Sequence, residues 1–130
     1  MKKYVLLVIL AFGIISFGCE KCEECDPDEY YIKYAVAVQT IYMGVALDIV
    51  MTNEYNETTP ISTTGSWNMT IGPVEKGFNA SLSAATEREI SSTILITKIY
   101  VSKNDGPFAE KASGESDTSE PVQIDYTIDF

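Results

Sequence analysis

Apolar and polar residues alternate strictly along the last nine residues of the chain. One face carries Val122, Ile124, Tyr126, Ile128 and Phe130, and polar residues occupy the positions between them. A period of two is typical of a half-buried β-strand, because successive side chains of a strand point to opposite faces. This alternation recurs along most of the chain after residue 29, and it constrains the fold more than any other feature of the sequence.

Turn residues divide the alternating region into about seven expected strands. Polar breaks are expected at residues 53–60 and 86–89, and Gly72-Pro73 is expected to end a strand. Asn104-Asp105-Gly106 predicts a tight hairpin, and a loop is expected over the polar residues 113–120. Alternation marks expected strands at 30–38, 47–52, 66–71, 78–84, 94–101 and 122–130, and after the hairpin the chain runs through residues 108–112.

The strand pattern predicts an all-β fold, because no segment shows a sustained helical period. Several short strands separated by turns favour an antiparallel, immunoglobulin-like β-sandwich of about seven strands, with a small closed barrel as the alternative. Residues 94–101 are the most continuously apolar, so we expect a central strand covered on both faces. Trp67 is expected to pack between the sheets.

The first eighteen residues have the order of regions found in a secretory signal peptide. Two lysines follow Met1, residues 5–15 are an unbroken apolar run, and the small residue Gly18 precedes Cys19. The apolar run is shorter than the ~20 residues that a membrane-spanning helix needs. The site resembles a lipobox, although Ser16 stands where the usual pattern has leucine. We therefore predict cleavage after residue 18 and a lipid anchor on Cys19.

Residues 19–29 are charged, poor in apolar side chains, and hold all three cysteines of the chain. Such a segment buries too little apolar surface to offset the entropy of ordering, so we expect a flexible tether. The C-x-x-C-x-x-C spacing resembles part of an iron–sulfur ligand run, but it lacks a fourth cysteine. For Cys22 and Cys25 we predict a disulfide formed in an oxidising compartment. Inert thiols, further acylation, intermolecular pairing, and metal or redox chemistry are the alternatives.

Charge and composition narrow the classes of function. The chain has 19 acidic and 9 basic residues, a net charge of −10, and such a surface repels nucleic acid and anionic lipid. Histidine is absent, which removes Ser-His and Cys-His catalysis and the commonest zinc ligand. Asp125 and Asp129 are about 13 Å apart along a strand, beyond either glycosidase geometry. We predict no enzymatic activity, no cofactor and no metal site.

Residues near the expected strand ends are the candidates for ligand contact. Tyr30, Tyr31, Tyr42 and Tyr55 lie there, together with Met43. Clustered tyrosines stack on sugars or anchor a protein partner, although tyrosine is also favoured in strands for packing alone. The four tyrosines are therefore predicted to contact either a glycan or an envelope protein.

The order of landmarks along the chain resembles a known family. A leading strand (IKYAVAV) precedes DIVMTNEYN, a tryptophan strand (SWNMTI), a small-residue strand (FNASLSAAT) and a long strand entering a hairpin (ILITKIYVSKNDGPF). Over residues 32–112 the chain is similar to the small β-sandwich domain of MmpS-type proteins, which accompany large lipid exporters of the RND class. The resemblance implies the fold and an accessory role beside an exporter. The anchor differs, because MmpS proteins carry a transmembrane helix where this chain has Cys19.

These observations predict three parts and a function. The parts are a lipoprotein signal peptide (1–18), an acidic tether (19–29) and a β-sandwich domain (30–130). The acidic residues after Cys19 resemble the signal that sends lipoproteins of Bacteroidetes type to the outer face of the outer membrane. We predict a non-catalytic protein of the bacterial cell envelope, lipid-anchored in the outer membrane on its surface or periplasmic face, which presents an interaction surface. A carbohydrate-binding module and an exporter subunit are the alternatives.

Overall fold

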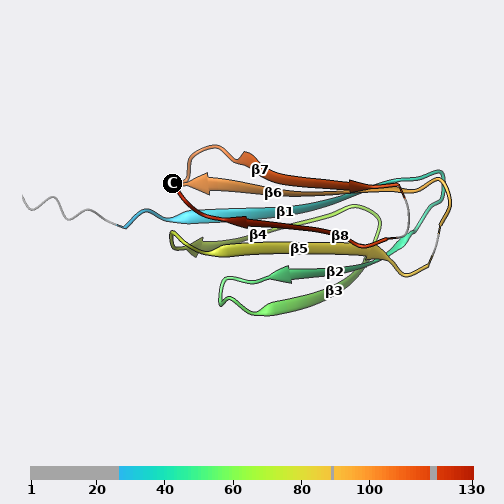
Figure 1. The fold of residues 1–130 in the computed structure, drawn as a ribbon, viewed down its shortest axis with the longest axis horizontal. Coiled ribbons are helices and arrows are strands. Elements are labelled where there is room, and N and C mark those ends of the chain that lie inside the picture. Colours follow the sequence, from blue (N-terminus) through green and yellow to red (C-terminus); the bar gives the residue numbers. More distant parts are fainter. Residues whose placement is uncertain (1–26, 89, 118–119) are drawn as a thin grey trace, which may run out of the picture.

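The computed structural model describes residues 27–88, 90–117 and 120–130. Within these residues the chain forms eight β-strands and no helix (Figure 1). Accordingly, the described part contains no helix that is long and apolar enough to span a membrane. The strands are β1 (Tyr30–Gln39), β2 (Ala46–Thr52), β3 (Thr58–Thr64), β4 (Trp67–Val74), β5 (Asn79–Thr86), β6 (Ile94–Lys103), β7 (Ala109–Ser116) and β8 (Val122–Thr127).

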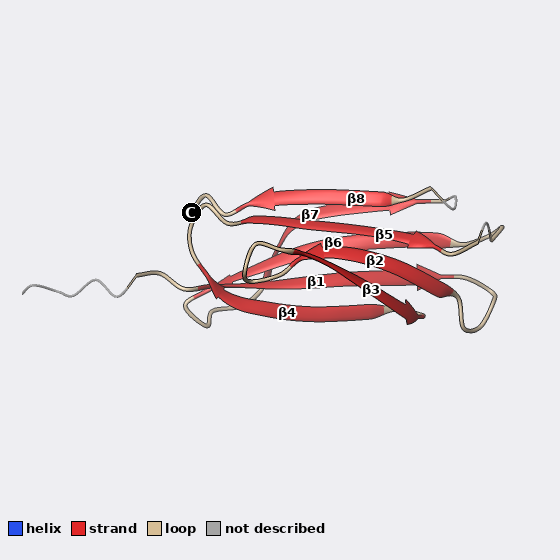
Figure 2. Ribbon diagram, turned by 90° about the horizontal axis from the view of Figure 1, so that it is seen from below, coloured by secondary structure: helices blue, strands red, loops and turns tan. Residues whose placement is uncertain are grey.

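The strands form two four-stranded sheets that pack face to face. One sheet has the order β4-β1-β6-β7 and the other β3-β2-β5-β8 (Figures 1 and 2). Neighbouring strands are antiparallel in both sheets. The predicted all-β antiparallel sandwich is therefore confirmed, with eight strands rather than seven. The closed barrel is excluded, because the strands pair in two separate sheets.

The core lies between the sheets and is built from the inward-facing positions of the alternation. In β1, Tyr30, Ile32, Tyr34 and Val36 are buried, whereas the residues between them are half-buried. The Tyr34 hydroxyl reaches the opposite sheet and donates a 2.8 Å hydrogen bond to the carbonyl oxygen of Thr52 in β2. The other buried apolar residues are Val45, Leu47, Ile49, Met51, Ile71, Val74, Ala80, Leu82, Ala84, Leu95, Ile99, Val101, Val122 and Ile128.

The additional strand, β3, covers residues that the sequence pattern had partly placed in a turn. Residues 53–57 do connect two strands, but residues 58–64 pair with β2 along their whole length. The prediction failed here because β3 is an edge strand rich in threonine and serine, with Ile61 as its one large apolar side chain. Pro60 is tolerated in it, since an edge strand pairs on one side only.

Several other expectations need correction. β4 continues through Gly72-Pro73, where the peptide bond is cis, and ends at Val74. Residues 113–116 belong to β7 rather than to a loop, because a solvated edge strand accommodates serine and glutamate. β6 is central as predicted, but its outer face is only half-buried. Trp67 lies opposite buried Val36 at the start of edge strand β4 and packs against the core as predicted, but it is only half-buried.

The predicted hairpin between β6 and β7 is confirmed. Asn104 and Asp105 have positive φ angles of 50° and 58°, which define a type I′ turn. The Gly106 amide donates a 2.9 Å hydrogen bond to the Lys103 carbonyl oxygen and closes the turn. Asparagine and aspartate adopt positive φ more readily than other non-glycine residues.

Strands β7 and β8 close one side of the sandwich, although they belong to different sheets. Their close approach depends on Gly114, because a Cβ at this position would lie 2.8 Å from methyl groups of both Val122 and Ile124. The Gly114 carbonyl oxygen accepts a 3.4 Å hydrogen bond from the hydroxyl of buried Thr97 in β6. This seam is therefore tightly packed, with no space for an additional methyl group.

The reversal of direction at each strand sorts the connections into two ends of the molecule (Figure 1). The end at which β1 begins, here called the proximal end, holds the β2–β3, β4–β5 and β6–β7 connections and the C-terminal residues. The opposite, distal end holds the β1–β2, β3–β4, β5–β6 and β7–β8 connections. A single strand, β1, joins the predicted tether to the distal end.

Candidate functional site

The β1–β2 connection, residues 40–45, exposes three consecutive apolar side chains at the distal end. We call it the apical loop. Met43 is 99% exposed, Ile41 79% and Tyr42 49%, whereas a soluble domain buries most side chains of this kind. These three residues are therefore the strongest candidates for contact with a partner.

The base of the apical loop is fixed to the sandwich. The Thr40 hydroxyl accepts hydrogen bonds from the Tyr42 amide at 3.2 Å and from the hydroxyl of buried Thr93 at 3.0 Å. Val45 is buried, and its carbonyl oxygen accepts a 2.9 Å hydrogen bond from the Gly65 amide. With both ends of the loop attached, the apolar tip is held away from the core instead of folding back onto it.

Two shallow hollows flank the apical loop. The first, of about 390 Å³, lies between the loop and the chain after β5; the second, of about 440 Å³, lies between the loop and the start of β6. We call the apical loop and the two hollows together the distal site. The first hollow is lined by Tyr42, Met43, Gly44, Val45, Ala46, Glu87, Arg88 and Ile90, and the second by Gln39, Thr40, Ile41, Ser92, Thr93, Ile94 and Asp117.

The charged groups of the distal site are mainly acidic. Glu87 and Asp117 are exposed, one at each hollow. Arg88 is the single cationic side chain among the described residues that line the two hollows. The site thus combines an apolar tip with an acidic margin.

The four candidate tyrosines do not form one cluster. Tyr42 belongs to the distal site, whereas Tyr55 is 76% exposed in the β2–β3 turn at the proximal end. Tyr31 also lies near the proximal end, where burial and the Glu29 carboxylate raise the pKa of its phenol. Tyr30 is a core residue whose hydroxyl donates to the Phe130 carbonyl oxygen.

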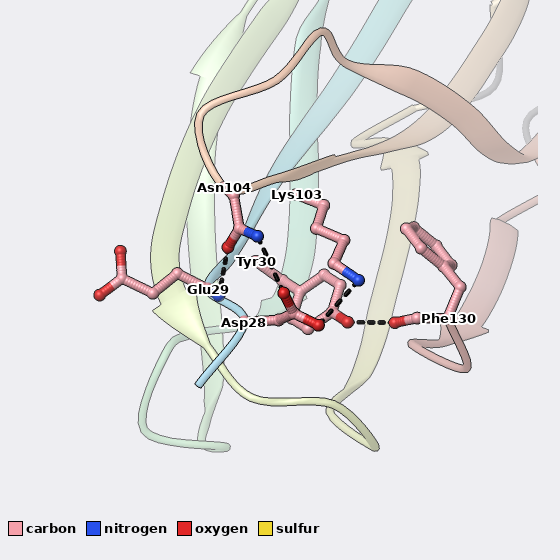
Figure 3. A network of polar contacts seen from close by, with 6 residues as sticks. All are labelled: Asp28, Glu29, Tyr30, Lys103, Asn104 and Phe130. Carbon is pink, nitrogen blue, oxygen red and sulfur yellow. Dashed lines mark hydrogen bonds and ion pairs between the residues drawn. The ribbon is translucent and has the colours of Figure 1, made fainter. Parts of the chain in front are cut away.

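A second concentration of polar contacts fixes the start of β1 to the β6–β7 turn (Figure 3). The Asn104 backbone N–H donates to the Glu29 carbonyl oxygen at 2.8 Å, and the Glu29 backbone N–H donates to Asn104 Oδ1 at 2.9 Å. Asn104 Nδ2 donates to Asp28 Oδ1 at 2.8 Å, and Lys103 Nζ lies 2.7 Å from Asp28 Oδ2. We call this set of contacts the junction, because it holds the last residues of the predicted tether.

The electrostatics of the junction favour the charged forms of its two ionic groups. The Lys103 ammonium, and after it the Asn104 side chain, lower the pKa of Asp28. The Asp28 carboxylate in turn raises the pKa of Lys103. Both groups are exposed, so the contacts position the chain more than they stabilise the fold.

The predicted modification sites lie outside the described residues. Cys19, Cys22 and Cys25 all precede residue 27, so lipidation and the disulfide stay predictions, as does the signal peptide. Among residues 27–88, 90–117 and 120–130, no group of three potential metal ligands occurs.

The sequence predicts Tyr42 and Met43 as contact residues, whereas Ile41, the hollows and the junction are evident only in the structure. The signal for the distal site was the run Ile41-Tyr42-Met43 within an expected connection. The junction had no local signal, because Asn104 lies 75 residues from Glu29 in the sequence. In comparisons with known proteins, the chain matches no family model and no curated protein.

Proposed function

We propose that this protein is a non-catalytic, lipid-anchored component of the bacterial cell envelope, and that it binds a partner through its distal site. The observation that carries the proposal is the arrangement of β1. The predicted tether precedes this strand at one end of the molecule, and the apical loop follows it at the other. Ten residues of strand separate the two by about 33 Å, so the exposed apolar tip faces away from the anchored end.

The edges of the sheets are less suited to binding than the distal site. β3 carries Pro60 and β4 carries Pro73, and proline on an edge strand opposes pairing with another chain. β7 and β8 pack against each other across the Gly114 seam. Binding by addition of a strand is therefore disfavoured, and the end loops are the better candidates.

The anchoring part of the proposal rests on the sequence. Acylation of Cys19 would attach the protein to the outer membrane, on its surface or periplasmic face, and residues 20–27 would separate the sandwich from the lipid. Intact mass spectrometry of membrane-extracted protein tests this directly. We expect a diacyl or triacyl adduct on mature protein that begins at Cys19, and no adduct on Cys19→Ala. Unchanged acylation of Cys19→Ala would refute the predicted anchor.

The binding part is tested by site-specific crosslinking in intact cells. A photoreactive amino acid at position 43 reports contacts of the apical loop, and the same residue at position 55 is the matched control, because Tyr55 is exposed at the opposite end. We expect a discrete protein adduct from position 43 and none from position 55. The adduct should disappear when Ile41→Ser is added. Equal adducts from both positions, or none from position 43, contradict the proposal.

The same variants discriminate between the alternative partners. An adduct with an envelope transporter would support the accessory role implied by the family resemblance. Binding of purified protein to a saccharide, lost in Tyr42→Ala and retained in Tyr55→Ala, would instead support a carbohydrate-binding module. Tyr42 is the aromatic residue of the distal site, so it is the residue on which a sugar would stack.

A further inference from the structure

The chemistry of the distal site specifies the kind of protein surface that would fit it. We propose that the partner receives the apical loop in an apolar pocket whose rim is cationic. This inference rests on the proposed function and extends it from the location of the site to the chemistry of its occupant.

The apical loop presents exposed apolar side chains on a base that is attached to the sandwich. Ile41, Tyr42 and Met43 are adjacent and expose most or half of their side chains, so a pocket that covers them gains in proportion to the apolar area removed from water. Tyrosine and methionine are enriched at protein interfaces. The loop base is already held by the Thr93–Thr40 hydrogen bond and by buried Val45, which lowers the entropy lost on binding.

The charged side chains of the distal site line its two hollows. Glu87 and Asp117 are both exposed, Glu87 at the first hollow and Asp117 at the second. Arg88 is the one cationic side chain among the described residues of the two hollows, and it follows Glu87 at the first hollow. The lysines of the described part lie at mid-strand or at the proximal end; they are Lys33, Lys76, Lys98, Lys103 and Lys111.

The same charges weigh against other occupants. The whole chain has a net charge of −10, so an anionic membrane surface or a nucleic acid is repelled from the site. A second copy of the chain would bring two acidic margins together, and like charges across an interface are unfavourable. A cationic rim around an apolar pocket complements both features of the distal site.

Synthetic peptides of defined charge test this chemistry directly. The probe is an amphipathic helical peptide of leucine and lysine, and two further peptides replace every lysine with glutamine or glutamate. Each is titrated into isotopically labelled, full-length mature protein in a non-ionic detergent, and NMR shifts of residues 40–45 report binding at the apical loop. We expect the lysine peptide to bind most tightly, the glutamine peptide less tightly and the glutamate peptide least.

Charge variants assign the effect to the rim. Glu87→Gln combined with Asp117→Asn should weaken binding of the lysine peptide roughly five-fold, in keeping with exposed charge pairs. Arg88→Gln should act in the opposite direction and strengthen it. Asp125→Asn is the matched control, because Asp125 is exposed on the outer face of β8 and away from the distal site.

The outcomes separate this inference from the proposed function. Equal affinity of the three peptides at the apical loop would overturn the cationic rim and leave the apolar site intact. Equal weakening by Asp125→Asn and by the Glu87 and Asp117 pair would also overturn it, because the charge would then act from the whole surface. If no peptide shifts residues 40–45, the inference fails, whereas the proposed function is decided by the crosslinks from position 43.

Discussion

The cross-sheet hydrogen bond of Tyr34 makes the stability of the sandwich sensitive to alkaline pH. Tyr34 is fully buried, and its hydroxyl donates to the Thr52 carbonyl oxygen. Burial raises the pKa of this phenol well above its ordinary value. The folded state therefore keeps the proton at a pH at which the unfolded chain, with a pKa near 10, releases it. The resulting contribution to stability is fully present below about pH 10 and is lost as the pH rises toward the folded pKa.

The free energies of unfolding of wild type and Tyr34→Phe should converge as the pH rises. At neutral pH, loss of the hydroxyl should lower the free energy of unfolding by about 1 kcal/mol, the typical net value of one hydrogen bond. Between neutral pH and about pH 11, ionisation of this tyrosine in the unfolded chain should cost wild type about 1.4 kcal/mol more than the variant. The difference between the two proteins should therefore vanish near pH 11.

Denaturant unfolding monitored by circular dichroism across this pH range measures both effects. Tyr55→Phe is the control for loss of a phenol hydroxyl at an exposed position, and at neutral pH it should stay within about 0.5 kcal/mol of wild type. If the curves of wild type and Tyr34→Phe run parallel from neutral pH to pH 11, the assigned role of the buried phenol is wrong.

Two further variants test the seam and the junction. Gly114→Ala should lower the free energy of unfolding by about 1–3 kcal/mol, because its Cβ would overlap methyl groups of Val122 and Ile124. The control is Ser113→Ala, on the exposed side of the same strand, which should leave thermal unfolding almost unchanged. Equal destabilisation by the two variants would contradict the tight seam. Asn104→Ala should lose the side-chain acceptor of the Glu29 amide and add about 1 kcal/mol of backbone strain at positive φ. Hydrogen exchange at the Glu29 backbone amide should then accelerate in both Asn104→Ala and Asn104→Gly, whereas only the alanine variant should show the backbone strain. Unchanged exchange in both variants would refute the hydrogen bond that we assign to Asn104 at the junction.

The parts of the fold that the sequence predicted are those where burial depends on one face of a strand. β1 and β8 follow their apolar alternation, and the β6–β7 turn follows from residues that tolerate positive φ. β3 and the end of β7 were missed because their backbones form ladders that their solvated side chains do not indicate. Edge strands therefore show a weak alternation of apolar and polar residues, because both of their faces can be solvated.

The distal site was only partly predictable because it depends on topology. The sequence indicates that Ile41-Tyr42-Met43 lies between two strands, but not which connections share an end of the sandwich with it. That is decided by the order of strands in the two sheets, which places Glu87 and Asp117 beside the loop. The same order separates Tyr42 from Tyr55, which residue type alone had grouped together.

The position of β1 has a mechanical consequence. A pull between the predicted lipid anchor and the proposed partner on the apical loop would pass along this one strand, whose ten residues are already close to their full extension. The load is therefore borne by covalent backbone with almost no slack, while hydrogen bonds to β4 and β6 hold the strand on both sides.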